Sequence, residues 1–304
     1  MGEDAAATYE ALVTTLGTRV RCREPLARHT SFRIGGPADV LAQPASADEL
    51  AAVVRAAAAH RLPVTVVGAG SNLLVGDGGI RGVVVKLGAG FRRVAWTTRG
   101  VTAGAAAHVG KLARAAVSRG LSGLEFAEGI PGTVGGALFM NAGAYGSEMA
   151  AVVEAVEGVT ADGRQTTLAA SDLSFAYRRS GVAPGFLVTG VTFRLAPQPA
   201  ETVARTLDAL RDRRLASQPQ GAANAGSIFK NPPGDYAGRL IEAAGLKGRR
   251  VGGAHISERH ANFIVNDGEA HAVDVQALMA EAQRAVWERS GVWLEPEIRL
   301  VGSW

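Results

Sequence analysis

The chain has 304 residues, enough for about two domains with buried cores and too many for a small disulfide-stapled scaffold. Hydrophobic residues make up 47% and charged residues 20%, a balance that excludes an intrinsically disordered chain. The net charge is +4, built from 28 Arg and only 4 Lys. The arginines are scattered, so a phosphorylated small ligand accounts for them as well as nucleic acid does.

The N-terminal residues carry no targeting signal. Met1 to Asp4 is acidic and is not followed by the apolar run of a signal peptide, and the sequence has no apolar stretch long enough for a membrane span. The single cysteine, Cys22, cannot form an internal disulfide and is expected to be a small packed side chain. We therefore expect a soluble, cytoplasmic protein.

The first third of the chain alternates between helix and strand signals. Ser46 and Glu49 have the spacing of a capping box, which predicts a helix ending near Pro63. Apolar runs then predict strands over 64–67 and 83–85, and an alanine-rich stretch predicts a helix over 104–119.

The remainder continues the alternation. Asp162-Gly163 predicts a hairpin turn between two strands, and Pro197 to Pro199 is typical of a linker. The polar tract 217–225 predicts a domain boundary. The other expected elements are strands over 152–160, 165–168, 186–195, 262–266 and 292–301, and helices over 202–215, 236–244 and 273–290. Two mixed blocks favour an α+β fold.

Gly68 and Gly70 follow a predicted strand, but they do not form a Rossmann fingerprint. Leu73 occupies the position of the third glycine, and Gly76 to Gly79 prevents the helix that should follow. No Walker A sequence occurs. The residues 68–72 therefore form either an ordinary turn or a cradle of backbone N–H groups for a diphosphate.

A second glycine-dense segment spans Gly129 to Gly146. Glycines let a backbone approach a flat ligand closely, although a loose loop is the alternative. Phe139 and Met140 within it are interpreted as core residues.

Several blocks together make the chain resemble the UDP-N-acetylmuramate dehydrogenase family, also called UDP-N-acetylenolpyruvoylglucosamine reductases, over nearly its whole length. These blocks are 29–38, 67–74, 129–136 with 141–146, 177–178, 226–232, 252–254, 260–266 and 294–299. The short run from Arg178 to Phe186 matches the compact type of this family, which lacks an inserted tyrosine-bearing loop.

The resemblance implies an FAD-binding region of the vanillyl-alcohol-oxidase type, made of two α+β subdomains, and a C-terminal α+β substrate-binding domain. We expect the subdomains at 1–87 and 88–215 and the substrate domain at 216–296, with 297–304 returning to the first subdomain. Its implied FAD-binding residues are Gly68, Ala69, Gly70, Ser71, Asn72, Leu73, Gly129, Gly132, Thr133, Gly136, Asn141, Gly143 and Ala144.

The resemblance also implies the reaction, in which NADPH reduces FAD and the enolpyruvyl ether of UDP-N-acetylglucosamine is then reduced to UDP-N-acetylmuramate for peptidoglycan. Ser227 matches the family's proton donor, and Glu297 matches a glutamate near the substrate carboxylate. Arg178 matches the arginine that binds this carboxylate. Arg179 is the neighbouring alternative to Arg178, and Glu295 is the neighbouring alternative to Glu297.

Tyr177, Lys230 and Asn231 are further candidates for substrate binding. His260 and Asn262 are candidates for supporting the site, and the spacing of His255 and His260 indicates no metal site.

Two other functions stay open: a sugar or alcohol oxidase of the same superfamily, and a noncatalytic nucleotide or nucleic-acid binder. We expect no nucleic acid or membrane partner, and a monomer or weak oligomer.

Overall fold

The computed structural model describes residues 2–304, whose contacts define two compact units. Unit 1 contains the chain up to Cys22 together with Val40–Ala69 and Gly82–Arg214. Unit 2 contains Arg23–Asp39, Gly70–Arg81 and Leu215–Trp304. The two units alternate along the sequence, and each is described by itself. The three predicted domain ranges stay a prediction.

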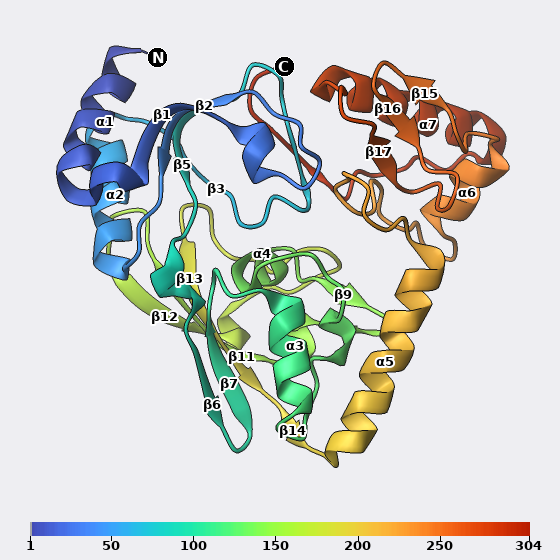
Figure 1. Cartoon of the computed structure of the whole chain (residues 1–304), viewed down its shortest axis with the longest axis horizontal. Helices are drawn as coiled ribbons and strands as arrows, with labels where there is room; N and C mark the ends of the chain where they lie inside the picture. The colour runs from blue at the N-terminus through green and yellow to red at the C-terminus, as the bar shows by residue number, and fades with distance from the viewer. Residues whose placement is uncertain (1) are drawn as a thin grey trace. The chain divides into compact units, whose positions relative to one another are not determined.

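The first core of unit 1 is built from two helices and from strands of a mixed sheet (Figure 1). The helices are α1 (Glu3–Leu16) and α2 (Ala47–Ala59). The sheet has the order β1 (Val20–Pro25), β2 (Pro37–Ala42), β5 (Ile80–Val85) and β3 (Val64–Val66), with β3 and β5 parallel. The Ser46 hydroxyl accepts the Glu49 N–H at 3.2 Å, which confirms the predicted helix start.

The second core of unit 1 lies on one face of a five-stranded antiparallel sheet, against α3 (Val109–Val117) and α4 (Val134–Phe139). Its strand order is β12 (Gln165–Ala169), β11 (Val153–Val159), β13 (Leu187–Arg194), β7 (Gly100–Gly104) and β6 (Val94–Thr97). Gly163, with a φ of +83°, closes the predicted hairpin between β11 and β12. The long helix α5 (Ala200–Ser217) contributes the buried Leu207.

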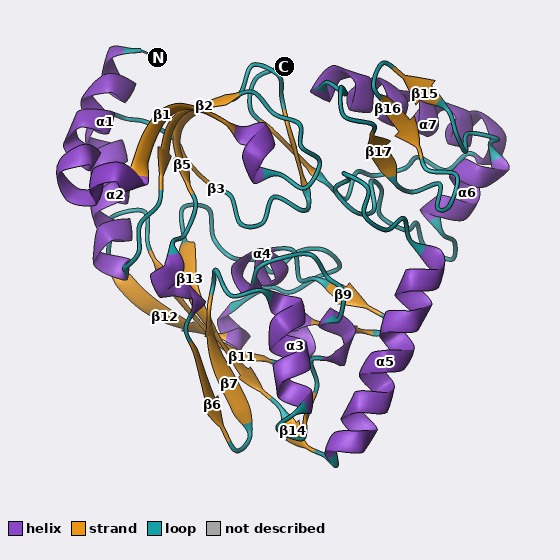
Figure 2. Ribbon diagram, viewed as in Figure 1, coloured by secondary structure: helices purple, strands orange, loops and turns teal. Residues whose placement is uncertain are grey.

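Unit 2 has one core, formed by α6 (Ala237–Ala243) and α7 (Ala272–Ser290) against a three-stranded antiparallel sheet (Figure 2). The sheet order is β15 (Arg250–Val251), β16 (Ala254–Ile256) and β17 (Ile264–Asn266). A separate parallel pair joins β4 (Leu73–Val75) to β18 (Arg299–Val301).

Short elements complete the chain. They are the pairs β8 (Leu121–Ser122) with β14 (Ala196–Pro197) and β9 (Gly143–Ala144) with β10 (Ser147–Glu148), and the 3₁₀ turns Gly17–Arg19, Leu26–His29, Ala89–Arg92, Glu125–Ala127, Met149–Ala151 and Ala170–Asp172. Within residues 2–304, no helix has the length and apolar character that crossing a bilayer requires.

Helix α7 is capped by a side chain from far away in the sequence. The Asp77 carboxylate accepts the N–H groups of Ala272 at 2.9 Å and Val273 at 3.3 Å, while Asp274 accepts the His271 N–H at 2.9 Å. These carboxylates satisfy donors that have no partner inside the helix and face the positive end of its dipole.

Several predicted elements differ from the structure. The predicted helix 104–119 begins only after His108, because Gly100–Gly104 pairs as strand β7. The predicted strand 292–301 is reduced to Arg299–Val301, since Pro296 lacks an N–H and its neighbours bond irregularly to 228–230. Part of the expected linker at Pro197 belongs to strand β14.

Three side-chain environments also differ from expectation. Cys22 is exposed on β1 rather than packed, and Phe139, interpreted as core, is 45% exposed because it ends the short helix α4. Met140 beside it is half-buried.

Removing the Asp77 carboxylate is expected to weaken unit 2. Asp77→Ala should lower the free energy of unfolding by about 0.5–2 kcal/mol, the usual cost of losing a helix cap. Asp77→Asn keeps one acceptor and should lose less. Denaturant titration checks both variants, and equal losses in the two would contradict capping as the cause.

Candidate active site

Within unit 1, the structure brings two predicted cofactor residues together. A Cβ on Gly68 would lie 2.7 Å from the Oγ1 of Thr133. Thr133 is the N-cap of α4, and its Oγ1 accepts the Gly136 N–H at 3.3 Å. Glycine at position 68 therefore lets the loop after β3 contact the start of α4.

Most N–H groups at the start of α4 are already used by the protein. Val134 donates to the Ala107 carbonyl at 2.8 Å, and Gly135 donates to the Ala105 carbonyl at 2.9 Å. Gly132 donates to the Ile130 carbonyl at 2.9 Å. This segment is therefore an ordered structure rather than a loose loop, and its glycines do not form an open row of donors.

The loop from Gly68 to Asn72 differs in this respect. Among residues 2–304, no hydrogen-bond acceptor is found for the five backbone N–H groups of this loop or for the Ser71 hydroxyl. Gly68, Ala69, Ser71 and Asn72 are half-exposed. Consecutive unsatisfied donors of this kind suit an anion such as a diphosphate.

Gly70 within this loop is required by the protein's own backbone. Its φ is +66°, and a Cβ there would lie 2.3 Å from the carbonyl oxygen of His29. His29 is itself held by Glu24, whose Oε1 lies 3.0 Å from the histidine Nε2. Leu73, which follows the loop, begins strand β4.

Asn141 is fully buried, and both ends of its amide are used. Its Nδ2 donates to the Ala176 carbonyl at 3.0 Å, and its Oδ1 accepts the Ala150 N–H at 2.9 Å. Ala176 and Arg179 are joined by two backbone hydrogen bonds, so Tyr177 and Arg178 form the tip of a tight turn.

This turn distinguishes Arg178 from Arg179. Arg178 adopts a φ of +58° and places its guanidinium 4.9 Å from the Tyr177 ring centre. It is half-buried, whereas Arg179 is exposed. A left-handed conformation in a residue that carries a Cβ is a local strain of the kind that accumulates at functional sites.

Gly143 and Ala144 form the two-residue strand β9, paired with β10. A Cβ on Gly143 would lie 2.6 Å from the Cβ of Glu148, so the hairpin requires glycine there.

Sequence reasoning missed a charged cluster beside Gly129. Glu128 is only 4% exposed, and its Oε2 accepts the Arg114 Nε at 3.0 Å. Burial lowers the pKa of the Arg214 guanidinium, and the nearby Tyr145 and Glu128 oppose this effect. A Cβ on Gly129 would meet the Arg214 side chain at 2.6 Å. The position of Glu128 directly before the glycine-rich block was the one feature of the sequence that could have indicated this cluster.

Within unit 2, the segments that carry Ser227 and Glu297 lie side by side. The Glu297 N–H donates to the Ile228 carbonyl at 2.7 Å, and the Lys230 N–H donates to the Glu295 carbonyl at 2.9 Å. Ser227 and Glu297 are both half-buried. Two side chains 70 positions apart in sequence are therefore held on adjoining backbone segments.

Asn262 fixes the other side of the Ser227 segment. Its side-chain amide accepts the Phe229 N–H at 2.9 Å and donates to the Phe229 carbonyl at 2.8 Å, and its own carbonyl accepts the Ile228 N–H at 2.9 Å. Asn262 is 3% exposed, so these bonds satisfy groups that water does not reach.

Lys230 and Glu295 form an ion pair through their side chains. Glu295, the alternative to Glu297, is therefore engaged with Lys230. Its side chain is 69% exposed, whereas Glu297 is half-buried. Asn231 accepts the Ala237 N–H at 3.1 Å and thereby positions the start of α6.

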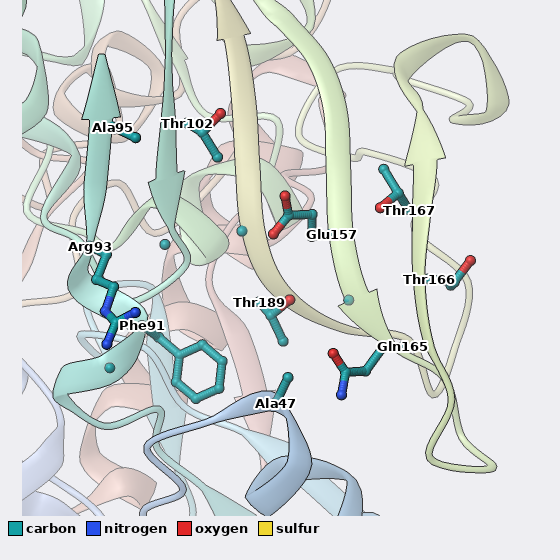
Figure 3. A pocket seen from close by; sticks show the side chains of 14 residues that line it. Ala47, Phe91, Arg93, Ala95, Thr102, Glu157, Gln165, Thr166, Thr167 and Thr189 are labelled. Atoms are coloured by element: carbon teal, nitrogen blue, oxygen red, sulfur yellow. The ribbon is translucent and has the colours of Figure 1, made fainter.

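Two cavities lie away from these residues. One, of about 450 Å³, lies on the five-stranded sheet of unit 1, and Figure 3 shows Thr102, Glu157 and Thr189 at its wall. The other, of about 380 Å³, lies in unit 2 beside Arg33 and Asp267. No predicted site residue lines either cavity. Across the described residues 2–304, no cluster of three or more His, Cys, Asp or Glu side chains is placed to hold a metal ion.

Comparison with known proteins first defines the class. A family model described as an FAD binding domain matches residues 38–169. The crystal structure of p-cresol methylhydroxylase superimposes with a TM-score of 0.51 at 13% identity, over 96% of this chain and 65% of the other, which shows the fold alone. The chain thus contains an FAD-binding domain and has the expected α+β fold of the vanillyl-alcohol-oxidase type.

The family follows from closer relatives. A model described as the C-terminal domain of UDP-N-acetylenolpyruvoylglucosamine reductase matches residues 218–301. UDP-N-acetylenolpyruvoylglucosamine reductase 2 of Symbiobacterium thermophilum is 49% identical, covering 93% of this chain and 92% of the relative. The crystal structure of the Thermus caldophilus reductase (MurB) has a TM-score of 0.82 at 41% identity, covering 93% and 99%. The chain belongs to the UDP-N-acetylenolpyruvoylglucosamine reductase family.

The residues present fit FAD. The unsatisfied N–H groups of Gly68 to Asn72 provide donors for a diphosphate, and the close contact of Gly68 with Thr133 joins this loop to the glycine-rich segment. The fit rests on unsatisfied donors rather than on helix α4, whose terminal N–H groups are used internally.

The contact between Gly68 and Thr133 can be tested by a pair of substitutions. Gly68→Ala should lower FAD affinity, because its Cβ would lie 2.7 Å from the Thr133 Oγ1 and displace the loop. Thr133→Ala removes that oxygen, so the double variant should bind FAD better than Gly68→Ala alone. Flavin fluorescence titration of the apoprotein measures the affinities. Additive losses would show that the two positions act independently.

His260 makes the Ser227 segment sensitive to acid. Burial and the charge of Lys247 lower the pKa of His260, whose neutral Nδ1 accepts the Asn262 N–H at 3.2 Å. Because the folded state disfavours the proton, the unfolded chain binds more protons between the two pKa values. The stabilising contribution is present above about pH 6.5 and is lost as the pH falls toward the lowered value.

We therefore expect the free energy of unfolding to decrease between about pH 7 and pH 5, and His260→Gln to reduce this decrease. Urea titrations across the pH range provide the measurement. Asn266→Ala, which removes a buried hydrogen bond elsewhere in unit 2 without removing a titratable group, serves as the control and should keep the wild-type slope. An unchanged slope in His260→Gln would rule out this origin.

Proposed function

We propose that this protein reduces UDP-N-acetylglucosamine enolpyruvate to UDP-N-acetylmuramate with NADPH as the reductant. Its family membership supports the reaction, and one observation in the structure supports the residue roles. This is the hydrogen bond from the Glu297 N–H to the Ile228 carbonyl, which holds the hydroxyl of Ser227 and the carboxyl of Glu297 on adjoining segments.

The reaction adds a hydride and a proton across a carbon–carbon double bond. When bound, FAD would supply the two-electron chemistry that couples oxidation of NADPH to hydride addition at C3 of the enolpyruvyl group. Ser227 then gives its hydroxyl proton to C2. A serine hydroxyl is a weak acid, so it can serve only because the carbanionic intermediate is a strong base.

Charged side chains bind and polarise the substrate. Arg178 binds the carboxylate of the enolpyruvyl group, where its forked donors also stabilise the negative charge that develops during hydride addition. Glu297 polarises the same group. Lys230 and Asn231 bind the nucleotide diphosphate, with Tyr177 contributing to the sugar-nucleotide site.

The biological setting follows from this reaction. The product is a soluble precursor of peptidoglycan, so the protein acts in the cytoplasm on small molecules, needs no nucleic acid or membrane partner, and supports wall growth and hence cell shape and division. The scattered arginines match binding of phosphorylated substrates.

Replacing Ser227 should separate the two half-reactions. Ser227→Ala should leave reduction of the bound flavin by NADPH unchanged and slow its reoxidation by the enolpyruvyl substrate by roughly 10²–10⁴-fold, the usual contribution of a general acid. Stopped-flow absorbance under anaerobic conditions follows both steps.

The matched control is Ser290→Ala, which removes a hydroxyl at the end of α7 and should change neither step. If Ser227→Ala slowed both half-reactions equally, the proton-donor role would be excluded. If oxygen reoxidised the wild-type flavin faster than the substrate does, an oxidase would be the better assignment.

A further inference from the structure

We propose that Asn72 is a positioning residue for Glu297. Asparagine is required at this position because its side-chain amide holds the Glu297 carbonyl rather than a ligand. The inference rests on the proposed function, because it is the proposed reaction that gives Glu297 its role. The loop from Gly68 to Asn72 then has two roles: its backbone N–H groups face the diphosphate, and the Asn72 side chain positions Glu297.

Two hydrogen bonds from Asn72 bracket one residue of the C-terminal segment. Its Nδ2 donates to the Glu297 carbonyl at 3.1 Å, and its own carbonyl accepts the Arg299 N–H at 2.9 Å. Ile298, between them, is 3% exposed and belongs to the core of unit 2. The parallel ladder of β4 and β18 begins at the next position, where Leu73 pairs with Arg299.

These bonds fix both peptide groups that flank the Cα of Glu297. The preceding one is held because the Glu297 N–H donates to the Ile228 carbonyl at 2.7 Å. The following one is held through its carbonyl by Asn72 and, over a longer distance, through its N–H, which Ile298 donates to the Ile228 carbonyl at 3.4 Å. A residue restrained at both peptides has its Cα–Cβ direction set, and Asn72 supplies the shorter of the two bonds on the C-terminal side of Glu297.

The chemistry of the bond is specific to an amide. The Glu297 carbonyl can only accept, so the side chain at position 72 must donate. Alanine would leave the carbonyl without this donor. Aspartate would place a negatively charged acceptor against it, so Asn72→Asp should be worse than Asn72→Ala although it preserves the shape.

The first test measures the half-reactions of the FAD-loaded protein. Asn72→Ala should slow reoxidation of the flavin by UDP-N-acetylglucosamine enolpyruvate by about three- to tenfold, the effect of one neutral hydrogen bond. The substitution keeps the backbone N–H at position 72, the group proposed to face the diphosphate, so reoxidation by the substrate should lose more than FAD occupancy or reduction by NADPH does. Asn72→Asp should be slower than Asn72→Ala.

The second test is a double-mutant cycle with Glu297→Gln. If Asn72 acts through the Glu297 carboxyl, Asn72→Ala should cause no further loss of reoxidation rate in the Glu297→Gln background. Asn266→Ala is the control, because this buried asparagine holds the Phe32 carbonyl elsewhere in unit 2 and should combine additively with Glu297→Gln. Hydrogen exchange provides a readout independent of turnover: Asn72→Ala should speed exchange of the Glu297 N–H.

The outcomes separate the two proposals. A wild-type flavin that the substrate does not reoxidise would overturn the proposed function and this inference with it. A reactive wild type in which Asn72→Ala and Glu297→Gln are additive, or in which Asn72→Ala chiefly lowers FAD occupancy, would overturn the inference alone.

Discussion

The hydrogen bond between the Glu297 N–H and the Ile228 carbonyl is the contact on which the site of unit 2 depends. The segment 226–230 forms no regular strand, so it has no ladder to hold it. Its position is set by residues 295–297 on one side and by the buried amide of Asn262 on the other. Because buried polar groups in such an arrangement are costly to leave unpaired, the two sides make the segment rigid without regular secondary structure.

The high glycine content has more than one physical origin. At Gly36, Gly76 and Gly79 a Cβ would lie about 2 Å from a backbone carbonyl oxygen of another segment, at 2.1, 2.2 and 1.9 Å. These positions are close crossings of the backbone within unit 2. At Gly68 the neighbour is instead a side-chain hydroxyl at the start of α4. The glycines thus serve chain packing first, and the ligand loop is built on that packing.

The sequence predicted the long, well-capped elements and the family, but not the geometry of the site. Helix α2 follows from Ser46 and Glu49, and the end of α7 follows from Gly291, which adopts the left-handed conformation. Such signals are local, so they can be read from a sequence. The family's blocks likewise indicated an FAD-binding oxidoreductase, as the comparisons confirm.

What could not be predicted depends on contacts between distant residues. Asp77 shows no local sign that it caps a helix that begins 195 positions later. Asn72 was interpreted through the glycine loop that contains it, whereas its side-chain amide bonds to a carbonyl 225 positions away. The alanine-rich stretch also placed the start of a helix at Gly104, which is instead the last residue of strand β7, because alanine- and glycine-rich sequence does not distinguish a helix from a strand between two others.

The pairing of β4 with β18 sets the order of events during biosynthesis. Residues 73–75 leave the ribosome long before residues 299–301, yet each strand is the other's partner. Unit 2 also contains the segment 23–39. Its early segments therefore cannot complete their packing until residues 82–214, which belong to unit 1, and then residues 215–304 have been translated. During this interval Phe32, Ile34 and Leu74 have no core to pack against, because their partners lie between Ala225 and Ile298, so these apolar side chains stay exposed on the nascent chain.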